Sequence, residues 1–280
     1  MLYPFPPKSI SLNGLRYHYL DEGRGDTLLM LHGNPTWSFF YRNLVSGLKD
    51  KYRCVVPDHI GCGLSDKPQK YNYTLGQHIE NLEALADHLE LTDLTLVMHD
   101  WGGAIGMGYA LRHPDRVKRL VLFNTAAFLS REIPWSINFC RLPLLGALAI
   151  QVFNAFAGLA ITRACESQMS QEAKSGYLAP YNSYANRIAI LRFVQDIPMS
   201  RKVPSFSLVK SIQDQLAKFA DRPVLIVWGK KDFCFNDYYL DRWLEYFPEA
   251  EVHEMADAGH YVVEDAHEQI VPIMKKFFMK

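Results

Sequence analysis

The stretch LTLVMHDWGG, Leu94 to Gly103, decides the fold of this chain. Its apolar first half is typical of a buried strand, and it leads without a loop into AIGMGYALRH, a run of small and apolar residues that is typical of a helix. So abrupt a turn presents one side chain at the carboxyl end of the strand. That side chain is Asp100, so the stretch predicts a carboxylate at the tip of a strand–turn–helix elbow.

Other apolar runs with strand character lie along the rest of the chain. They are Arg16–Gly23, Thr27–Gly33, Arg53–Asp58, Leu94–His99, Arg119–Asn124, Val224–Gly229 and Ala250–Met255. Helical patterns separate most of them. In LGQHIENLEALADHLE, residues 75–90, apolar residues recur every three or four positions, and Thr74 is expected to cap the start. Strands that alternate with helices predict an α/β fold with a mostly parallel central sheet flanked by helices.

Residues 125–215 differ from this pattern because they are rich in aromatic residues and show no clear strand. We expect a helical cap there, inserted into a main domain formed by residues 1–124 and 216–280. Within the cap, no charged residue lies between Arg141 and Arg163, a run of about membrane-spanning length. Because proline, glycine and amide residues interrupt the run, we expect a buried or pocket-lining helical element rather than a transmembrane span.

The composition limits the classes of partner. The chain has 280 residues, 49% of them hydrophobic, and its 30 basic and 30 acidic residues give a net charge of zero. This balance argues against nucleic acid and against an anionic membrane surface, and favours a small molecule as the partner. No G-x-G-x-x-G, P-loop or H-E-x-x-H motif is present, so we expect no cofactor and no metal. The N-terminus lacks the pattern of a signal peptide, and the cysteines fit no zinc or disulfide spacing, which predicts reduced thiols and a cytoplasmic location.

Polar residues that directly follow the expected strands are candidates for the site, because ligands of parallel sheets bind beyond the carboxyl ends of the strands. These residues are Asn34, Asp100, Trp101, Asn124, Asp232 and His260. The chain order nucleophile, acid, histidine is that of enzymes with a G-x-S-x-G elbow. Here Asp100 replaces the serine and Met98 the first glycine. A carboxylate is already ionised at neutral pH and can attack directly, forming an ester or anhydride with the enzyme.

His260 and Asp232 can complete this chemistry. His260 can activate water against the covalent intermediate, while Asp232 can accept the other imidazole N–H and stabilise the imidazolium. The Asn124 amide cannot supply that charge, which favours Asp232. His32 and His99 flank the site, and we expect both rings to be structural and bonded to neighbouring backbone.

Four segments resemble the haloalkane dehalogenase family of the α/β-hydrolase superfamily: HGNPTWSFFYR, PDHIGCGLSDKP, HDWGGAIG and the late GH, Gly259–His260. VPDHIGCGLSDKP, NTAAF and LAPYNSYANRIAILRFVQDIPMS are more similar to one subgroup, the β-lactone decarboxylases of bacterial long-chain olefin biosynthesis. The resemblance implies an α/β-hydrolase fold. It also implies that Asn34 and Trp101 stabilise a departing halide or an oxyanion.

The resemblance favours one activity, the decarboxylation of cis-3,4-dialkyl β-lactones to cis-olefins through a covalent Asp100 intermediate. The alternative hypothesis is a haloalkane dehalogenase, and the third is an epoxide hydrolase that uses Tyr177, Tyr181 or Tyr184. A non-enzymatic hypothesis is a ligand receptor that uses the same pocket without turnover. Whether Asp100 attacks the carbonyl or the ring carbon stays open, as do alkyl chain length and oligomeric state. A substrate so insoluble in water also suggests assembly with the other enzymes of olefin synthesis. The expected apolar pocket residues are Phe128, Trp135, Phe139, Phe153, Phe156 and Tyr177.

Overall fold

A computed structural model describes residues 2–280, whose centre is an eight-stranded sheet in the order β1-β2-β4-β3-β5-β6-β7-β8. The first two pairings, β1 with β2 and β2 with β4, are antiparallel, and all other pairings are parallel. The strands are β1 Lys8–Leu12, β2 Leu15–Glu22, β3 Thr27–Leu31, β4 Arg53–Pro57, β5 Leu94–Asp100, β6 Val117–Thr125, β7 Val224–Gly229 and β8 Glu251–Met255.

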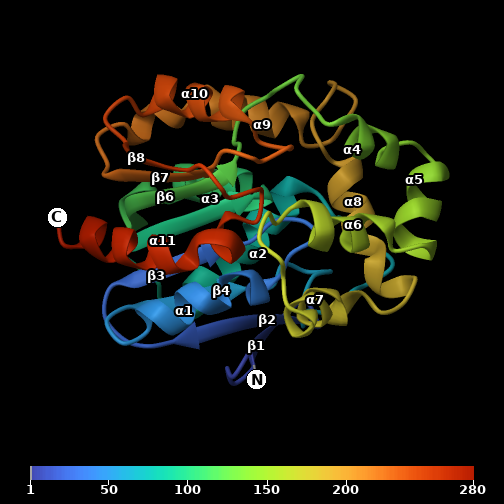
Figure 1. Cartoon of the computed structure of the whole chain (residues 1–280), viewed down its shortest axis with the longest axis horizontal. Coiled ribbons are helices and arrows are strands. Elements are labelled where there is room, and N and C mark those ends of the chain that lie inside the picture. Colours follow the sequence, from blue (N-terminus) through green and yellow to red (C-terminus); the bar gives the residue numbers. More distant parts are fainter. Residues whose placement is uncertain (1) are drawn as a thin grey trace.

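Helices cover both faces of this sheet (Figure 1). The α-helices are α1 Arg42–Leu48, α2 Leu75–His88, α3 Trp101–Arg112, α4 Trp135–Cys140, α5 Leu145–Ala147, α6 Ala155–Arg163, α7 Gln171–Leu178, α8 Ile188–Gln195, α9 Phe206–Gln213, α10 Asp237–Tyr246 and α11 Val262–Phe278. Shorter 3-10 segments are Ser38–Tyr41, Pro114–Arg116, Ala179–Tyr181, Ala185–Arg187 and Leu216–Phe219, and Leu148–Val152 is a π-helical turn. The predicted α/β-hydrolase architecture, a mostly parallel sheet flanked by helices, is confirmed.

The strand β3 shows why the central strands are apolar throughout. Leu29 and Leu31 pack into the core on the face of α2 and α3, whereas Leu28 and Met30 pack into the core on the face of α1 and α11. Successive side chains of a strand point to opposite faces, so a strand covered on both sides needs apolar residues at every position. This double burial is the reason that the central strands were recognisable as continuous apolar runs.

All seven predicted strands are present, with ends shifted by two residues or fewer. The strand β1 was missed, because this exposed edge segment, KSISL, has only a weak apolar alternation. A local pattern could have revealed it. Asn13 and Gly14 both have positive φ, 51° and 82°, and connect β1 to β2 as a two-residue hairpin turn, for which Asn-Gly is the typical sequence.

The insertion between β6 and β7 contains helices but no strand, as predicted, and Figure 1 shows α4 to α8 gathered at one end of the sheet. It also caps α2. Thr74 occupies the N-cap position, but its side chain makes no cap hydrogen bond, contrary to the prediction. Instead, the backbone N–H of Leu75 donates to Asp196 Oδ2 (2.9 Å) and Ser205 Oγ (3.1 Å), both from the insertion.

The uncharged run from Arg141 to Arg163 is helical and lines the cavity through residues such as Phe156 and Ala160, as one half of the prediction had it, but much of it is exposed rather than buried. It forms α5, the π-helical turn and α6, and the two helical pieces meet at an angle of 70°. Within residues 2–280, no single helix has the length and apolarity needed to cross a membrane. Large side chains in this run that are exposed are Leu142, Leu144, Leu145, Leu148, Val152, Phe153 and Leu159.

Candidate active site

The elbow predicted from Leu94–Gly103 is formed by the end of β5 and the start of α3. Asp100 lies at the junction with φ 51° and ψ −124°, a strained conformation for a residue with a side chain. A positive φ of this kind turns the chain sharply enough for the side chain to stand beyond the sheet. The strained backbone thus places the Asp100 carboxylate at the base of the cavity described below.

Glycines make room for this turn. A Cβ on Gly33 would lie 1.9 Å from Asp100 Oδ1, and a Cβ on Gly102 would lie 2.0 Å from the carbonyl oxygen of Leu31. Met98 occupies the position where such elbows usually have a glycine, and Gly106 on the next turn of α3 accommodates it, since a Cβ there would meet Met98 Sδ at 2.4 Å. The space that the elbow lacks at Met98 is therefore supplied by Gly106.

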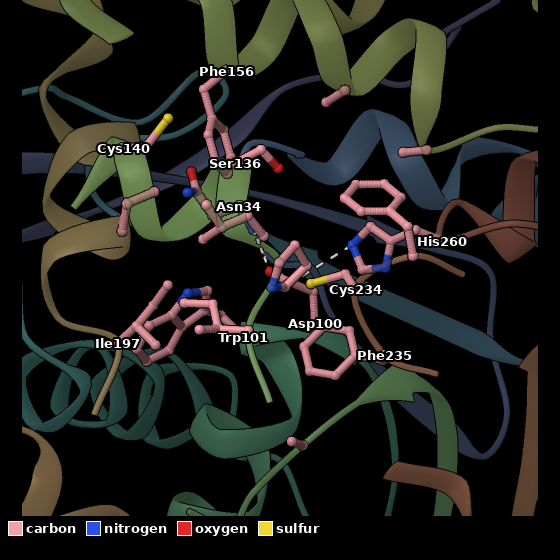
Figure 2. A pocket seen from close by; sticks show the side chains of 18 of the residues that line it. Asn34, Asp100, Trp101, Ser136, Cys140, Phe156, Ile197, Cys234, Phe235 and His260 are labelled. Atoms are coloured by element: carbon pink, nitrogen blue, oxygen red, sulfur yellow. Dashed lines mark hydrogen bonds and ion pairs between the residues drawn. The ribbon is translucent and has the colours of Figure 1, made fainter. Parts of the chain in front are cut away.

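The two carboxylate oxygens of Asp100 have different surroundings (Figure 2). The backbone N–H of Asn34 donates to Oδ1 at 2.7 Å, and the backbone N–H of Trp101 also bonds to this carboxylate. His260 Nε2 lies 3.9 Å from Oδ2. Oδ1 thus accepts the hydrogen bond of Asn34, whereas Oδ2 is the oxygen on the side of His260.

His260 is bonded to Asp232, as predicted for a histidine–acid pair. His260 Nδ1 donates to Asp232 Oδ2 at 2.8 Å, and Asp232 Oδ1 accepts the backbone N–H of Cys234 at 2.6 Å. Both side chains are buried. Asn124 lies elsewhere: its amide exchanges hydrogen bonds with the N–H and carbonyl of Gly229, joining the ends of β6 and β7. The structure therefore brings Asp232, rather than Asn124, to the histidine.

Burial and charge shift the pKa values of this group. Burial raises the pKa of Asp100 above its usual value, and the charge of His260 and the two backbone N–H groups offset this only in part. Burial by itself lowers the pKa of His260, but the charge and hydrogen bond of Asp232 and the charge of Asp100 outweigh it, so the net pKa is raised. The site thus favours an imidazolium beside its carboxylates.

Backbone contacts fix the loop that carries His260. His99 Nε2 donates to the carbonyl of His260 at 2.9 Å, and the N–H of Tyr261 donates to the carbonyl of Ala164 at 2.6 Å. His32 Nδ1 donates to the carbonyl of Gly33 at 2.7 Å. The bonds of His32 and His99 agree with the structural roles expected for them, and the bond from Tyr261 to Ala164 ties the loop of His260 to the insertion.

A cavity of about 450 Å³ opens above Asp100, between the sheet and the insertion. Asn34, Asp100, Trp101 and His260 lie together on its inner wall, and Asp232 stands behind His260. Asn34 Nδ2 donates to the carbonyl of Ile190 at 3.2 Å. Since an amide NH₂ has two N–H groups, one remains for a ligand.

The apolar wall of the cavity matches four of the six predicted residues. Phe128, Trp135, Phe139 and Phe156 line it. Phe153 and Tyr177 do not: Phe153 is 70% exposed, and the Tyr177 hydroxyl donates to Glu264 Oε2 at 2.8 Å in a buried cluster with Arg42. The prediction for these two residues is wrong, because periodicity does not tell which face of a cap helix meets the cavity.

Further lining residues were missed by the sequence analysis. Cys234 and Phe235 follow the predicted acid in the same loop, and Phe235 stacks on the His260 ring with centroids 5.6 Å apart. Their closeness to Asp232 in the chain is a signal that could have found them. Ile197 and Val194, from the end of α8 and just beyond it, carry no such signal.

This fold and site define an enzyme of the α/β-hydrolase class with a carboxylate at the nucleophile position. The α/β hydrolase fold family matches residues 26–139 and 165–266. The chain belongs to this family.

Two relatives share more than the fold. A cis-3-alkyl-4-alkyloxetan-2-one decarboxylase of Shewanella oneidensis is 50% identical, covering 99% of this chain and 89% of its own length. A protein of the same name from Xanthomonas campestris is 45% identical, covering 98% and 96%. The resemblance identified from the sequence is thus confirmed.

Haloalkane dehalogenases are also related to the chain. Haloalkane dehalogenase 2 of Mycobacterium tuberculosis is 31% identical, covering 99% of this chain and 96% of its own. Among solved structures, the haloalkane dehalogenase DatA from Agrobacterium tumefaciens superposes with a TM-score of 0.86 at 26% identity, covering 98% and 96% of the two chains.

Proposed function

We propose that this enzyme decarboxylates cis-3,4-dialkyl β-lactones to cis-olefins, with Asp100 as the covalent nucleophile. The observation that carries the proposal is the position of Asp100 Oδ2, free at the base of an apolar cavity and 3.9 Å from His260 Nε2. The names of the relatives at 50% and 45% identity then select the lactone among the substrates that such a site can accept.

Electron counting favours attack at the ring carbon that bears the ring oxygen. Asp100 Oδ2 bonds to this carbon and the carbon–oxygen bond breaks, which leaves a carboxylate on the neighbouring carbon. The bond to that carboxylate then breaks, its electron pair forms the double bond, and Asp100 leaves with its own pair. The products are carbon dioxide, the olefin and free Asp100, and neither water nor a proton is consumed.

Attack at the lactone carbonyl does not balance in this way. It gives an anhydride and an alkoxide, and hydrolysis then gives a β-hydroxy acid, because the original carbon–oxygen bond is intact. Attack at the ring carbon also accounts for the geometry of the product. It inverts that carbon, and departure of carbon dioxide and Asp100 from opposite faces then gives the cis-olefin from the cis-lactone.

Asn34 and Trp101 have a direct role in this route. The departing ring oxygen occupies the place that a halide occupies in dehalogenation, in line with the Asp100 attack. The amide of Asn34 and the indole of Trp101 both line this part of the cavity. Hydrogen-bond donors aimed at developing negative charge often make the largest single contribution to stabilising the transition state in such sites.

Haloalkane hydrolysis is the second candidate, supported by the relatives at 31% identity. The epoxide alternative is weaker in this structure. The hydroxyls of Tyr177 and Tyr181 are bonded to Glu264 and to the carbonyl of Thr36, and Tyr184 is exposed. None of these tyrosines lines the cavity, so none is placed to protonate an epoxide oxygen.

One experiment separates the two leading candidates. Purified enzyme is offered a cis-dialkyl β-lactone and a panel of bromoalkanes, with olefin followed by gas chromatography and halide release in parallel. Turnover in water labelled with oxygen-18 leaves Asp100 unlabelled if the intermediate collapses without water, whereas hydrolysis of an alkyl ester labels it. Rapid halide release without olefin would leave an ordinary dehalogenase.

Two expectations from the sequence remain predictions. The first is a cytoplasmic location, with which the five free cysteines are consistent. The second is assembly with other enzymes of olefin synthesis, which would spare an insoluble substrate a passage through water. Co-elution of the purified enzymes in size-exclusion chromatography tests it.

A further inference from the structure

The insertion exposes a continuous stretch of apolar side chains. Nine of the fifteen large apolar side chains that are exposed in residues 2–280 fall between positions 135 and 159. Three are almost fully uncovered: Leu144 at 85%, Trp135 at 81% and Phe153 at 70%. We call this set the apolar cap surface: Trp135, Phe139, Leu142, Leu144, Leu145, Leu148, Val152, Phe153 and Leu159. Such a concentration on one segment marks a surface that meets an apolar partner.

The position of this surface is at the edge of the molecule. Figure 1 shows α4 and α5 at the end opposite the C-terminus. The backbone there runs through α5, the π-helical turn and α6 with a bend of 70°. A bent and partly buried pair of this kind is suited to lie along an interface, not to cross a bilayer.

The charges around the surface select its partner. No acidic residue lies between Glu132 and Glu166, whereas Arg141 lies within the segment and Arg163 just after it. Neither arginine forms an ion pair with any side chain of residues 2–280. The net charge of the whole chain is zero, yet from Ile133 to Cys165 the only charged side chains are these two arginines, and Glu132, which also lines the cavity, precedes them. The apolar cap surface therefore complements anionic lipid headgroups and would repel a second copy of itself.

The surface is continuous with the mouth of the active-site cavity. Trp135, Phe139 and Leu159 belong to the apolar cap surface and also line the cavity, and Arg163 lines it as well. We propose that the apolar cap surface docks on a bilayer that contains anionic lipids, so that the cavity opens toward the acyl chains. Uptake of a long-chain substrate from the lipid rests on the proposed function, whereas docking itself does not.

Flotation with lipid vesicles, in the absence of substrate, tests the docking. The full chain is mixed with vesicles of phosphatidylcholine, with or without phosphatidylglycerol. The variant Leu144→Ser/Leu148→Ser/Phe153→Ser removes side chains that do not line the cavity, and the matched control Leu2→Ser/Leu64→Ser/Met279→Ser removes exposed apolar side chains elsewhere. We expect the first variant to bind more than about tenfold more weakly, and the control to bind as wild type does.

Charge gives a second readout. Arg141→Gln is expected to weaken binding about fivefold on vesicles with phosphatidylglycerol and little on phosphatidylcholine alone, because each juxtamembrane arginine contributes about 1 kcal/mol on anionic lipid. Turnover of a short-chain, water-soluble β-lactone should be unchanged in all of these variants. That assay reports on the proposed function separately from docking.

Three results would overturn the docking proposal. The first is a wild-type chain that does not float with vesicles of either composition. The second is an equal loss of binding in the apolar variant and its control. The third is a dimer without vesicles that the apolar variant dissociates, which would make this surface an interface between two copies.

Discussion

Replacing Asp232 with asparagine isolates the acid of the site with little change in shape. The wild-type carboxylate accepts two hydrogen bonds, from His260 Nδ1 at 2.8 Å and from the backbone N–H of Cys234 at 2.6 Å. Asparagine has one accepting oxygen. If this oxygen keeps its hydrogen bond from the backbone N–H of Cys234, the NH₂ group faces His260 Nδ1, which must then accept a hydrogen bond. The imidazole proton moves to Nε2, and His260 can no longer act as a base toward the cavity.

The magnitude follows from the charge that is lost. An ion pair whose charge centres are about 4 Å apart contributes roughly 4 kcal/mol at an effective dielectric constant near 20. At about 1.4 kcal/mol for each factor of ten, its loss lowers the rate of a step that needs the imidazolium by about 10³-fold. The wrong tautomer adds to this, and in a comparable triad the same substitution costs about 10⁴-fold. We therefore expect haloalkane turnover to fall by about 10³- to 10⁴-fold with the fold intact, and olefin formation, which needs only ionised Asp100, to fall far less.

Two measurements check this together. Turnover is followed as olefin from the lactone and as halide from a bromoalkane, and nitrogen-15 NMR of the His260 ring reports whether Nδ1 or Nε2 carries the proton. Asp237→Asn is the matched control, because Asp237 pairs with Lys230 and not with His260. Halide release within tenfold of wild type, with the proton still on Nδ1, would refute the role of Asp232.

Three shorter predictions concern the same loop. His260→Ala should still be alkylated by a bromoalkane but not released, giving an adduct on Asp100 in intact-mass spectra; an adduct at the same site in Asp100→Ala would contradict the nucleophile. Hydrolysis of the alkyl ester needs the neutral His260 ring, whose pKa is raised, whereas olefin formation needs only ionised Asp100. As the pH is lowered, steady-state halide release should therefore be lost at a higher pH than olefin formation. Loss of both activities at the same pH would count against the water-free route. Asp265 accepts the N–H groups of Gly259 (2.9 Å), Glu166 (3.0 Å) and Ser167 (2.8 Å), so Asp265→Ala should destabilise the chain by about 1–3 kcal/mol in thermal or urea unfolding. Burial opposes ionisation of Asp265, but these hydrogen bonds and that of Cys165 lower its pKa in the folded state. The contribution of Asp265 to stability is therefore present above its pKa in the unfolded chain and is lost as the pH falls through its pKa in the folded chain. A variant as stable as wild type at neutral pH would disprove this contribution.

The sheet and the inner wall of the site were predictable because both depend on local pattern. Buried strands are apolar at every position, and residues such as Asp100 and His260 directly follow strands or turns that place them at one edge of the sheet. The hairpin strand β1 escaped because its edge position demands few apolar residues. The Asn13–Gly14 turn was the better evidence there.

The cap was predictable as helical but not in its orientation. Tyr177 was expected in the cavity, yet a bidentate pair of Arg42 with Glu264, at 2.7 Å for each bond, draws its hydroxyl into the core. Phe153 was also expected in the cavity, but it lies on the surface directly after a π-helical turn. Both outcomes depend on contacts between residues far apart in the chain, which the spacing of aromatic residues along one helix does not contain.

Under the proposed mechanism, the same site can serve hydrolysis and decarboxylation because the two reactions share their first step. In both, Asp100 Oδ2 would displace a leaving group from carbon, and the donors of Asn34 and Trp101 would stabilise the group that leaves. The intermediates then differ in one feature: the lactone leaves a carboxylate beside the new ester, and a haloalkane leaves none. Expulsion of Asp100 by that carboxylate is unimolecular, whereas hydrolysis must wait for water to enter an apolar cavity. Under this mechanism, the substrate decides which reaction follows the covalent step.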